Sequence, residues 1–500
     1  MKRERCAGIL MPISALPSGE GIGTLGEGAY AFIDFLRDSG MKIWQVLPLN
    51  PTNYGDSPYQ SCCSNALNYY FIDLQLLVRD HLLTEDEITE ADLGGNARRV
   101  DYGKQFTRKI ALLRRAFSRF DPESADFKAF VSQGNYADFA SFMALKCKFG
   151  HRAWEEWDAP YRDYDERIVA AYLAENRQEY LFWQFTQFIF LRQWQGVKAY
   201  ANKNGVRIMG DIPLYLAYDS VEMWKYGDKL FRVDSHRRPS CVAGVPPDAF
   251  SEDGQLWGNP LYDWEKMKED GYAFWNGRIR ACLNLFDILR IDHFRGFDRY
   301  YAIPAGETTA KNGHWEDGPK EELFADKRDY DIVAEDLGVL DDGVIRLMDR
   351  VGYPGMKILE FAFDGSPANE HKPSNYRENF VCYTGTHDNM PLRQYIEDLP
   401  AEYFDRFQTD LTAECEKLGL TADLTSSVSM CRTVIRLAFA SVAFAVVIPM
   451  WDLLAMGGEA RMNLPSVMSD KNWSFRFVDG DFTPVLAGFL KDLATATRRV

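Results

Sequence analysis

Short apolar runs recur along the chain, and each is followed by polar residues. Eight of them are rich in residues typical of strands: 8–13, 42–47, 206–212, 286–292, 330–335, 356–361, 379–383 and 442–449. Runs of this kind, apolar at nearly every position, are typical of strands that are buried on both faces of a parallel sheet. The pattern therefore predicts eight buried parallel strands.

Between several of these runs, apolar residues recur at intervals of three and four, which is the spacing of a helix with one buried face. This spacing predicts helices at 29–37, 180–200, 261–285 and 433–440. Eight strands that alternate with helices are typical of the α/β class, specifically a (β/α)8 barrel. We therefore expect the 500 residues to form a single barrel domain.

The spacing between the predicted strands is uneven. The longest gap, between the second and third strands, contains the charged and helix-rich segment 84–164, which we interpret as a helical insertion; the alternative is a separate domain. A further segment, 297–328, lies between the fourth and fifth strands and contains Gly306, Gly313 and Gly318-Pro319. Because these residues are turn signals, we expect a loop-like insertion there.

Charge and aromatic content narrow the class of ligand. The net charge is −16, and a polyanion such as nucleic acid would be repelled. Aromatic residues make up 14% of the chain, with 12 Trp and 25 Tyr. Most will lie in the core, but flat rings also suit the C–H faces of sugars.

The cysteines and the apolar stretches bear on the compartment. Nine cysteines without a CxxC pair suggest neither a disulfide framework nor a zinc site. The first apolar run stops at Pro12, unlike a signal peptide, and the longest, 437–450, is too short to span a bilayer. We therefore expect a cytoplasmic protein without a membrane segment. No motif for phosphate, dinucleotide or metal binding is evident, so we expect no cofactor and no metal.

Acidic residues stand at the ends of four predicted strands. Asp211 ends the third strand, Asp292 the fourth, Glu335-Asp336 follows the fifth, and His387-Asp388 follows the seventh. In a (β/α)8 barrel, the active site is built at the carboxyl ends of the strands. One such acid is more often a cap or a surface charge than a catalytic group, but four at one rim favour an active site.

Paired carboxyl groups are what glycoside chemistry requires. One protonates the leaving oxygen, while the other attacks the anomeric carbon or activates a water molecule. Repulsion within a cluster of carboxylates keeps one of them protonated near neutral pH. Arg290 lies two residues before Asp292, so on a strand both point to the same face, and its cation would keep Asp292 ionised.

Motifs around these acids resemble a known family. RIDHFRGF (290–297), AEDLG (334–338), GDIP (210–213) and TGTHDN (384–389) resemble the short motifs of the α-amylase superfamily. Longer stretches resemble the amylomaltase (disproportionating enzyme) family: PISALPS (12–18), WQVLPLNPT (44–52), YGDSPYQS (54–61), VAGVPPDAFSEDGQLWGNPLYDW (242–264), GEARMN (458–463) and Asn472-Trp473. Since these stretches run along the whole chain in order, the resemblance covers all of it.

The resemblance implies a 4-alpha-glucanotransferase that acts on α-1,4-glucans and maltooligosaccharides, with glucose as one acceptor. It implies that Asp292 is the nucleophile, that Glu335 is the general acid and then the base, and that Asp388 binds sugar hydroxyls as a third carboxylate. The other site residues that it implies hold the substrate: Arg290, His293, His387, Asp211, Tyr59, Ser57, Asp248, Trp257 and Asn259. Asp248, Trp257 and Asn259 lie in the segment 242–264, which resembles a lid loop over the acceptor side.

Two other functions use the same residues. An α-glucan hydrolase would share the carboxylates, and a non-catalytic glucan-binding protein could keep the barrel, although the presence of all three acids disfavours the latter. The sequence also departs from the family pattern around the expected pocket, at Asn50, Asn53, Met390-Pro391, Trp451 and the run 62–68. These departures concern substrate length and the ratio of transfer to hydrolysis, and not the acids themselves.

Overall fold

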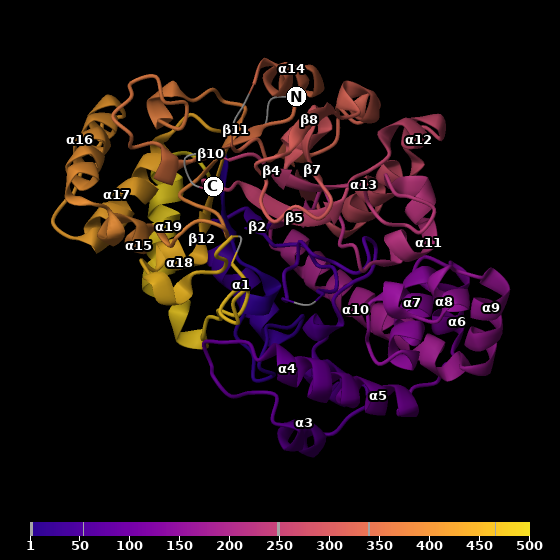
Figure 1. Ribbon diagram of the computed structural model, residues 1–500. Helices are drawn as coiled ribbons and strands as arrows, with labels where there is room; N and C mark the ends of the chain where they lie inside the picture. Colours follow the sequence, from indigo (N-terminus) through magenta and orange to yellow (C-terminus); the bar gives the residue numbers. More distant parts are fainter. Residues whose placement is uncertain (1–3, 54, 248–250, 339–340, 466) are drawn as a thin grey trace.

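Eight parallel strands form a barrel at the positions of the eight predicted apolar runs (Figure 1). The computed structural model describes residues 4–53, 55–247, 251–338, 341–465 and 467–500. The barrel strands are β1 (Cys6–Leu10), β2 (Ile43–Gln45), β3 (Arg207–Ile212), β6 (Ile288–Ile291), β9 (Ile332–Ala334), β10 (Gly355–Ile358), β11 (Phe380–Tyr383) and β12 (Ala445–Pro449). The predicted α/β barrel is thus confirmed.

The strands follow one another around the barrel in the order β10-β11-β12-β1-β2-β3-β6-β9. The amide of Ala334 donates to the carbonyl of Pro354 at 2.9 Å, which joins the two ends of this order. Strand β12 is buried at all five positions, and β3 at all but its first. Burial on both faces explains why these strands read as unbroken apolar runs.

Helices surround the barrel, with α15 to α19 on one side and α5 to α10 on the other (Figure 1). Those that fall at predicted helical segments are α1 (Glu27–Asp38), α10 (Arg177–Lys203) and α17 (Ser427–Ala440). Six further helices follow β3: α11 (Val221–Leu230), α14 (Asp342–Val351), α15 (Leu392–Asp398), α16 (Ala401–Lys417), α18 (Met450–Leu453) and α19 (Pro484–Ala496).

The helix predicted at 261–285 is interrupted in the structure. Segment 261–285 contains two helices, α12 (Trp264–Glu269) and α13 (Ala273–Leu285). Between them, Gly271 and Tyr272 have φ angles of 68° and 60°, in the left-handed region. This conformation breaks a right-handed helix, although the apolar spacing continues across it.

The connection between β2 and β3 is helical, as expected for 84–164. Its helices are α2 (Leu74–Arg79), α3 (Glu85–Ala91), α4 (Tyr102–Lys104), α5 (Ile110–Arg119), α6 (Ala125–Ser132), α7 (Ala137–Lys148), α8 (Ala159–Arg162) and α9 (Glu166–Glu175). Helix α7 packs against α10, which in turn contacts β3. The division of the chain into one domain with an insertion stays a prediction.

Two segments that we expected to be loops form a second sheet. Strands β4 (Cys241–Val245), β5 (Gln255–Pro260), β7 (Arg299–Pro304) and β8 (His314–Asp317) pair antiparallel in the order β5-β4-β7-β8. The segment 242–264 therefore contributes a hairpin, and 297–328 contributes the other two strands. Strands β4, β5 and β8 contain Gly, Gln, His or acidic residues, so no apolar run marks them, and β7 has only the four-residue apolar run 300–303.

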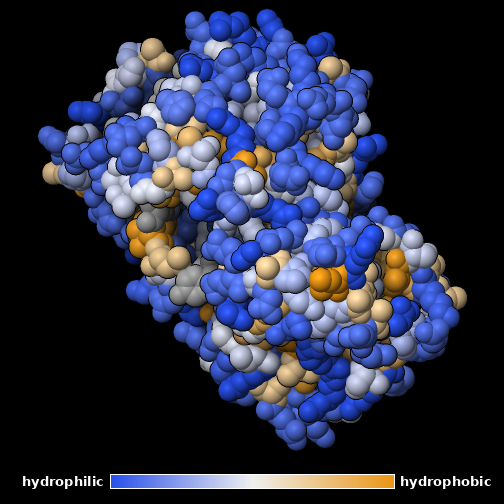
Figure 2. Space-filling view, turned by 45° about the vertical axis from the view of Figure 1, so that its right-hand side comes forward, coloured by the Kyte–Doolittle hydropathy of each residue, from blue (hydrophilic) through white to orange (hydrophobic). Residues whose placement is uncertain are grey.

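Hydrophilic residues cover most of the face shown in Figure 2, and the apolar ones form small separate groups. None of the helices in the described parts of the chain has both the length and the apolar composition needed to cross a bilayer.

Gly210 makes a prediction about packing possible. It precedes Asp211 on β3, and a Cβ there would lie 2.0 Å from the Phe286 ring. We expect Gly210→Ala to lower the free energy of unfolding by about 1–3 kcal/mol, because the core has no room for the methyl group. Urea unfolding followed by tryptophan fluorescence measures the change.

The matched control is Gly277→Ala in α13, where nothing lies within 4 Å of the added Cβ. This change should raise the free energy of unfolding by about 0.5–1 kcal/mol, since alanine is the better helix former. Equal effects of the two substitutions would contradict this account of β3.

Candidate active site

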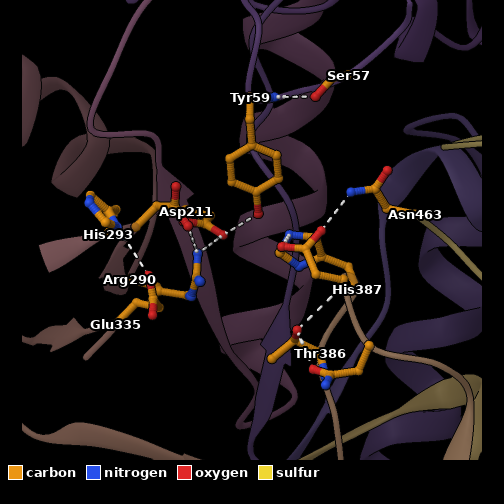
Figure 3. Close-up of polar contacts among 12 residues, drawn as sticks. Ser57, Tyr59, Asp211, Arg290, His293, Glu335, Thr386, His387 and Asn463 are labelled. Carbon is orange, nitrogen blue, oxygen red and sulfur yellow. Dashed lines mark hydrogen bonds and ion pairs between the residues drawn. The ribbon is translucent and has the colours of Figure 1, made fainter. Parts of the chain in front are cut away.

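Arg290 connects two of the expected site acids. It pairs in register with Asp211 across β3 and β6, so both side chains leave neighbouring strands at the same level. Its Nη1 donates to Asp211 Oδ2 at 2.6 Å and to Asp292 Oδ1 at 3.1 Å. Arg290 and Asp211 are labelled in Figure 3. Only 3% of Arg290 is exposed, so its charge needs these two partners.

Glu335 lies next to Asp292 at the same rim. Strands β6 and β9 are neighbours with Ile291 opposite Ala334, so the two acids follow paired residues. The amide of His293, the residue after Asp292, donates to Glu335 Oε2 at 2.7 Å. The amide of Leu337 donates to Glu335 Oε1 at 2.7 Å. Glu335 is therefore tied to the residue that follows Asp292, and its charge acts on Asp292.

Asp388 enters from the loop after β11. Asn463 donates to its Oδ1 at 2.6 Å, and His387 Nε2 lies 3.4 Å from its Oδ2. Half of the Asp388 side chain is exposed, whereas His387 is buried. Asp388 also contributes to the electrostatic environment of Asp292 and Glu335, so the third expected acid belongs to the same cluster.

Tyr59 covers the centre of this cluster. Its hydroxyl donates to Asp211 Oδ2 at 2.7 Å, and its ring stacks on His387 at a centroid distance of 4.9 Å and an angle of 11°. Figure 3 shows the ring pointing between the Arg290 group on one side and the His387 group on the other. Ser57 accepts a hydrogen bond from the Tyr59 amide at 3.3 Å, which shapes the loop that carries the ring.

Trp257, on β5 of the second sheet, packs against His293, the residue that follows Asp292. Its ring meets the His293 ring edge to face, at a centroid distance of 4.9 Å. His293 Nε2 is buried and has no hydrogen-bond partner among the described residues. Asp248 lies outside the described residues.

Asn259 also lies on β5, but its amide is engaged by the protein. It donates to the Leu216 carbonyl at 2.8 Å and exchanges hydrogen bonds of 3.1 Å with the Gln60 side chain. Asn259 therefore ties β5 to the segment that carries Tyr59. Its expected contact with substrate stays a prediction.

The electrostatics of the two central acids are dominated by burial. Burial raises the pKa of Asp292 well above its usual range; Arg290 opposes this, while Asp211, Glu335 and Asp388 add to it. Burial also raises the pKa of Glu335, against Arg290 and its two amide hydrogen bonds. Because neighbouring carboxylates repel, the pair retains a proton at pH values where an isolated acid would lose it.

The two histidines of the site differ from the acids. Burial lowers the pKa of His293 to about 3, with a smaller contribution from Arg295. Burial also lowers the pKa of His387, although Asp388 opposes the shift. Both rings are therefore neutral near pH 7 and can donate or accept a hydrogen bond. No group of three or more His, Cys, Asp or Glu side chains in the described part of the chain is arranged to hold a metal ion.

Two residues of the site were given no role from the sequence. Asn463 binds Asp388, and the Trp473 ring lies 5.9 Å from Tyr59 and 5.8 Å from His387. Both stand in stretches that carry the family resemblance, which was the available signal. Nothing in their own spacing relates them to acids that lie far away in the chain.

One departure from the family pattern has a clear structural role. Asn50 donates to the carbonyls of Ser64 and Ala66, both at 2.9 Å. Asn50 and the unusual run 62–68 thus support each other through these hydrogen bonds. The loop that they form follows the segment that carries Tyr59.

Comparison with known proteins gives one consistent result. A family described as 4-alpha-glucanotransferase matches residues 11–480. The chain is 41% identical to a 4-alpha-glucanotransferase of Streptococcus pneumoniae over 511 residues, covering 100% of this chain and 98% of that protein. A 4-alpha-glucanotransferase of Thermus thermophilus is also 41% identical, over 517 residues and the full length of both chains.

Solved structures agree with these sequence matches. The amylomaltase of Streptococcus agalactiae, solved in complex with acarbose, superposes with a TM-score of 0.93. That protein is 37% identical, and the match covers 99% of this chain and 100% of that one. The similarity therefore extends over the barrel, the helical connection and the second sheet.

Proposed function

The chain belongs to the 4-alpha-glucanotransferase family, and from this membership we propose that it transfers α-1,4-glucan segments through a covalent glucosyl ester of Asp292. The observation that supports this route is the adjacency of Asp292 and Glu335, with Arg290 bonded to the first and backbone amides to the second. A glycosidase-type double displacement needs one carboxylate and one carboxylic acid that flank the same glycosidic bond.

In the first step, an Asp292 oxygen attacks the anomeric carbon of the donor glucan. The bond between this carbon and the glycosidic oxygen breaks, and Glu335 gives its proton to that oxygen, which leaves as the 4-hydroxyl of the departing chain. In the second step, an acceptor 4-hydroxyl transfers its proton to the Glu335 carboxylate and attacks the same carbon, which releases Asp292. Two inversions restore the α configuration.

The other site residues hold the reacting sugar in this proposal. Asp388 accepts hydrogen bonds from sugar hydroxyls, and its exposed half leaves oxygen atoms open for them. Neutral His293 and His387 contribute ring nitrogens, and Tyr59 supplies a flat surface. Asp211 holds both Arg290 and Tyr59 in place.

Transfer requires that a sugar hydroxyl reach the ester before water does. Trp257 lies on β5 directly against His293, and we assign it as the platform for the acceptor glucose. A platform of this kind orients the acceptor and displaces water from the ester. The hydrolase alternative uses the same acids, and the difference lies in this exclusion of water.

Substrate range and location are part of the proposal. The acceptors are glucose and maltooligosaccharides, whose 4-hydroxyls are equivalent for the second step. All nine cysteines are free, and five of them are buried, which is typical of proteins in a reducing compartment. We therefore place the enzyme in the cytoplasm.

Incubation with maltotriose tests the function directly. We expect glucose together with a ladder of longer maltooligosaccharides, because each glucosyl ester is passed to another sugar chain. Chromatography of the products over time separates the alternatives. Maltose and glucose alone would indicate hydrolysis, and unchanged maltotriose would indicate a binding protein.

Single substitutions test the roles of the two acids. Asp292→Asn should lower kcat on maltotriose at least about a thousandfold, since the nucleophile is lost. Glu335→Gln should lower it by about 10²–10⁴-fold, yet spare ester formation from a glucosyl donor whose leaving group needs no proton. Steady-state kinetics and mass spectrometry of the ester measure these effects.

Asp287→Asn and Asp331→Asn are matched controls, because these acids lie just before β6 and β9, at the other end of the barrel. Both controls should retain the wild-type rate. Turnover by Asp292→Asn at the rate of its control would reject the nucleophile assignment.

The charge of Asp211 should be visible in the pH profile. Asp292 acts in its ionised form, so kcat/KM falls on the acid side as Asp292 becomes protonated. Asp211 helps to raise the pKa of Asp292, and Asp211→Asn should therefore move this acid limb to lower pH. Profiles measured for the variant, for wild type and for Asp287→Asn give the comparison; a limb that moves to higher pH would contradict the assignment.

A further inference from the structure

A second pair of buried carboxyl groups lies behind the loop that carries Asp388. This loop, 384–392, connects β11 to α15. Asp452, which is 1% exposed, binds both of its ends: Oδ2 accepts from the Thr384 hydroxyl at 2.5 Å, and Oδ1 accepts from the Leu392 amide at 2.8 Å. One side chain thus fixes the span of the loop.

Glu360 supports the middle of the same loop. It follows β10, is 6% exposed, and its amide donates to the Thr384 carbonyl at 3.1 Å. The loop backbone passes so close that a Cβ on Gly385 would lie 2.7 Å from Glu360 Oε1. Glu360 Oε1 is buried and has no hydrogen-bond partner among the described residues, and the nearby Asn389 side chain lowers the pKa of Glu360.

Asn389 is connected to Asp388 through Thr386. Its Oδ1 accepts from both the amide and the hydroxyl of Thr386, each at 2.9 Å. The Thr386 hydroxyl in turn accepts from the Asp388 amide at 3.3 Å. Hydrogen bonds therefore run from Asn389, which lies beside Glu360, through Thr386 to the backbone of Asp388.

The charges around Glu360 favour its neutral form. Burial and the Asp452 carboxylate raise the pKa of Glu360 well above its usual range, while Asn389 and Arg461 oppose the shift. Burial also raises the pKa of Asp452 to about 7. The other titratable groups whose charges interact with this pair are Asp388, through Arg461, together with Tyr395 and Cys431. A neutral Glu360 can donate a hydrogen bond as well as accept one, as a glutamine would.

We propose that Glu360 and Asp452 are positioning residues that set the orientation of Asp388 for the transfer reaction. Asp452 holds the two ends of the loop, and Glu360 packs against it at Thr384 and Gly385 and lies beside Asn389. Since Asp388 is bonded to Asn463 on its other side, the loop and residue 463 together determine where its free oxygen points. The inference rests on the proposed role of Asp388 in binding the reacting sugar.

A double-mutant cycle with Asp388 tests the inference. Glu360→Ala should lower kcat on maltotriose roughly 10- to 100-fold, because a displaced catalytic group costs this much. In an Asp388→Asn background the same change should alter the remaining rate less than about twofold, since the group that it positions is already lost. A merely structural role would lower both rates by the same factor, and that result would overturn the proposal.

The conservative variant provides an independent check. Glu360→Gln preserves the shape and the donor of the neutral acid, so it should recover most of the rate that Glu360→Ala loses. A kcat for Glu360→Gln that is no higher than the kcat for Glu360→Ala would contradict the requirement for a neutral hydrogen-bonding side chain. Asp364→Asn, at an exposed acid four residues further along, is the matched control and should match wild type.

Two further outcomes separate this inference from the proposed function. If Asp388→Asn alone has the wild-type rate, the role of Asp388 is wrong and the inference falls with it. If Asp388→Asn lowers the rate but the cycle is additive, only the positioning role is wrong. Should Glu360→Ala not fold, as judged by circular dichroism, the same cycle with Asn389→Ala decides, because that change removes the hydrogen bonds from Thr386 to Asn389.

Discussion

The buried ion pair of Arg290 with Asp211 and Asp292 is the interaction on which the site depends. A guanidinium that is 3% exposed would be strongly unfavourable alone, and two carboxylates on neighbouring strands would repel each other without it. The pair also fixes the rim of the barrel, since it spans β3 and β6. Tyr59 then bonds to the same Asp211, so the ion pair also helps to orient the Tyr59 ring.

The three expected catalytic acids have different hydrogen-bond and ion-pair partners. Asp292 has a cation, Glu335 has two backbone amides, and Asp388 has an amide side chain and solvent. A charge stabilises the ionised form of an acid more strongly than neutral donors do. In the proposed mechanism, this difference in partners suits Asp292 to act as nucleophile, Glu335 as proton donor and Asp388 as sugar ligand.

The sequence was informative where one element decides the outcome. Unbroken apolar runs located all eight barrel strands, and the two-residue spacing of Arg290 and Asp292 placed their side chains together. It was uninformative where distant segments decide. The pairing of β4 with β7, and the contact of Asn463 with Asp388, join residues that no local pattern relates. The break at Gly271-Tyr272 was missed because the apolar spacing continues through a backbone turn that only φ angles reveal.

The second sheet has a consequence for how this family can vary. Its β4–β5 hairpin lies in the connection after β3, and its β7–β8 hairpin lies in the connection after β6. The two connections are joined by the backbone hydrogen bonds between β4 and β7. A lengthening or shortening of either connection must preserve the register of the other. In related proteins, changes within the paired strands of one segment are therefore expected to accompany changes in the other.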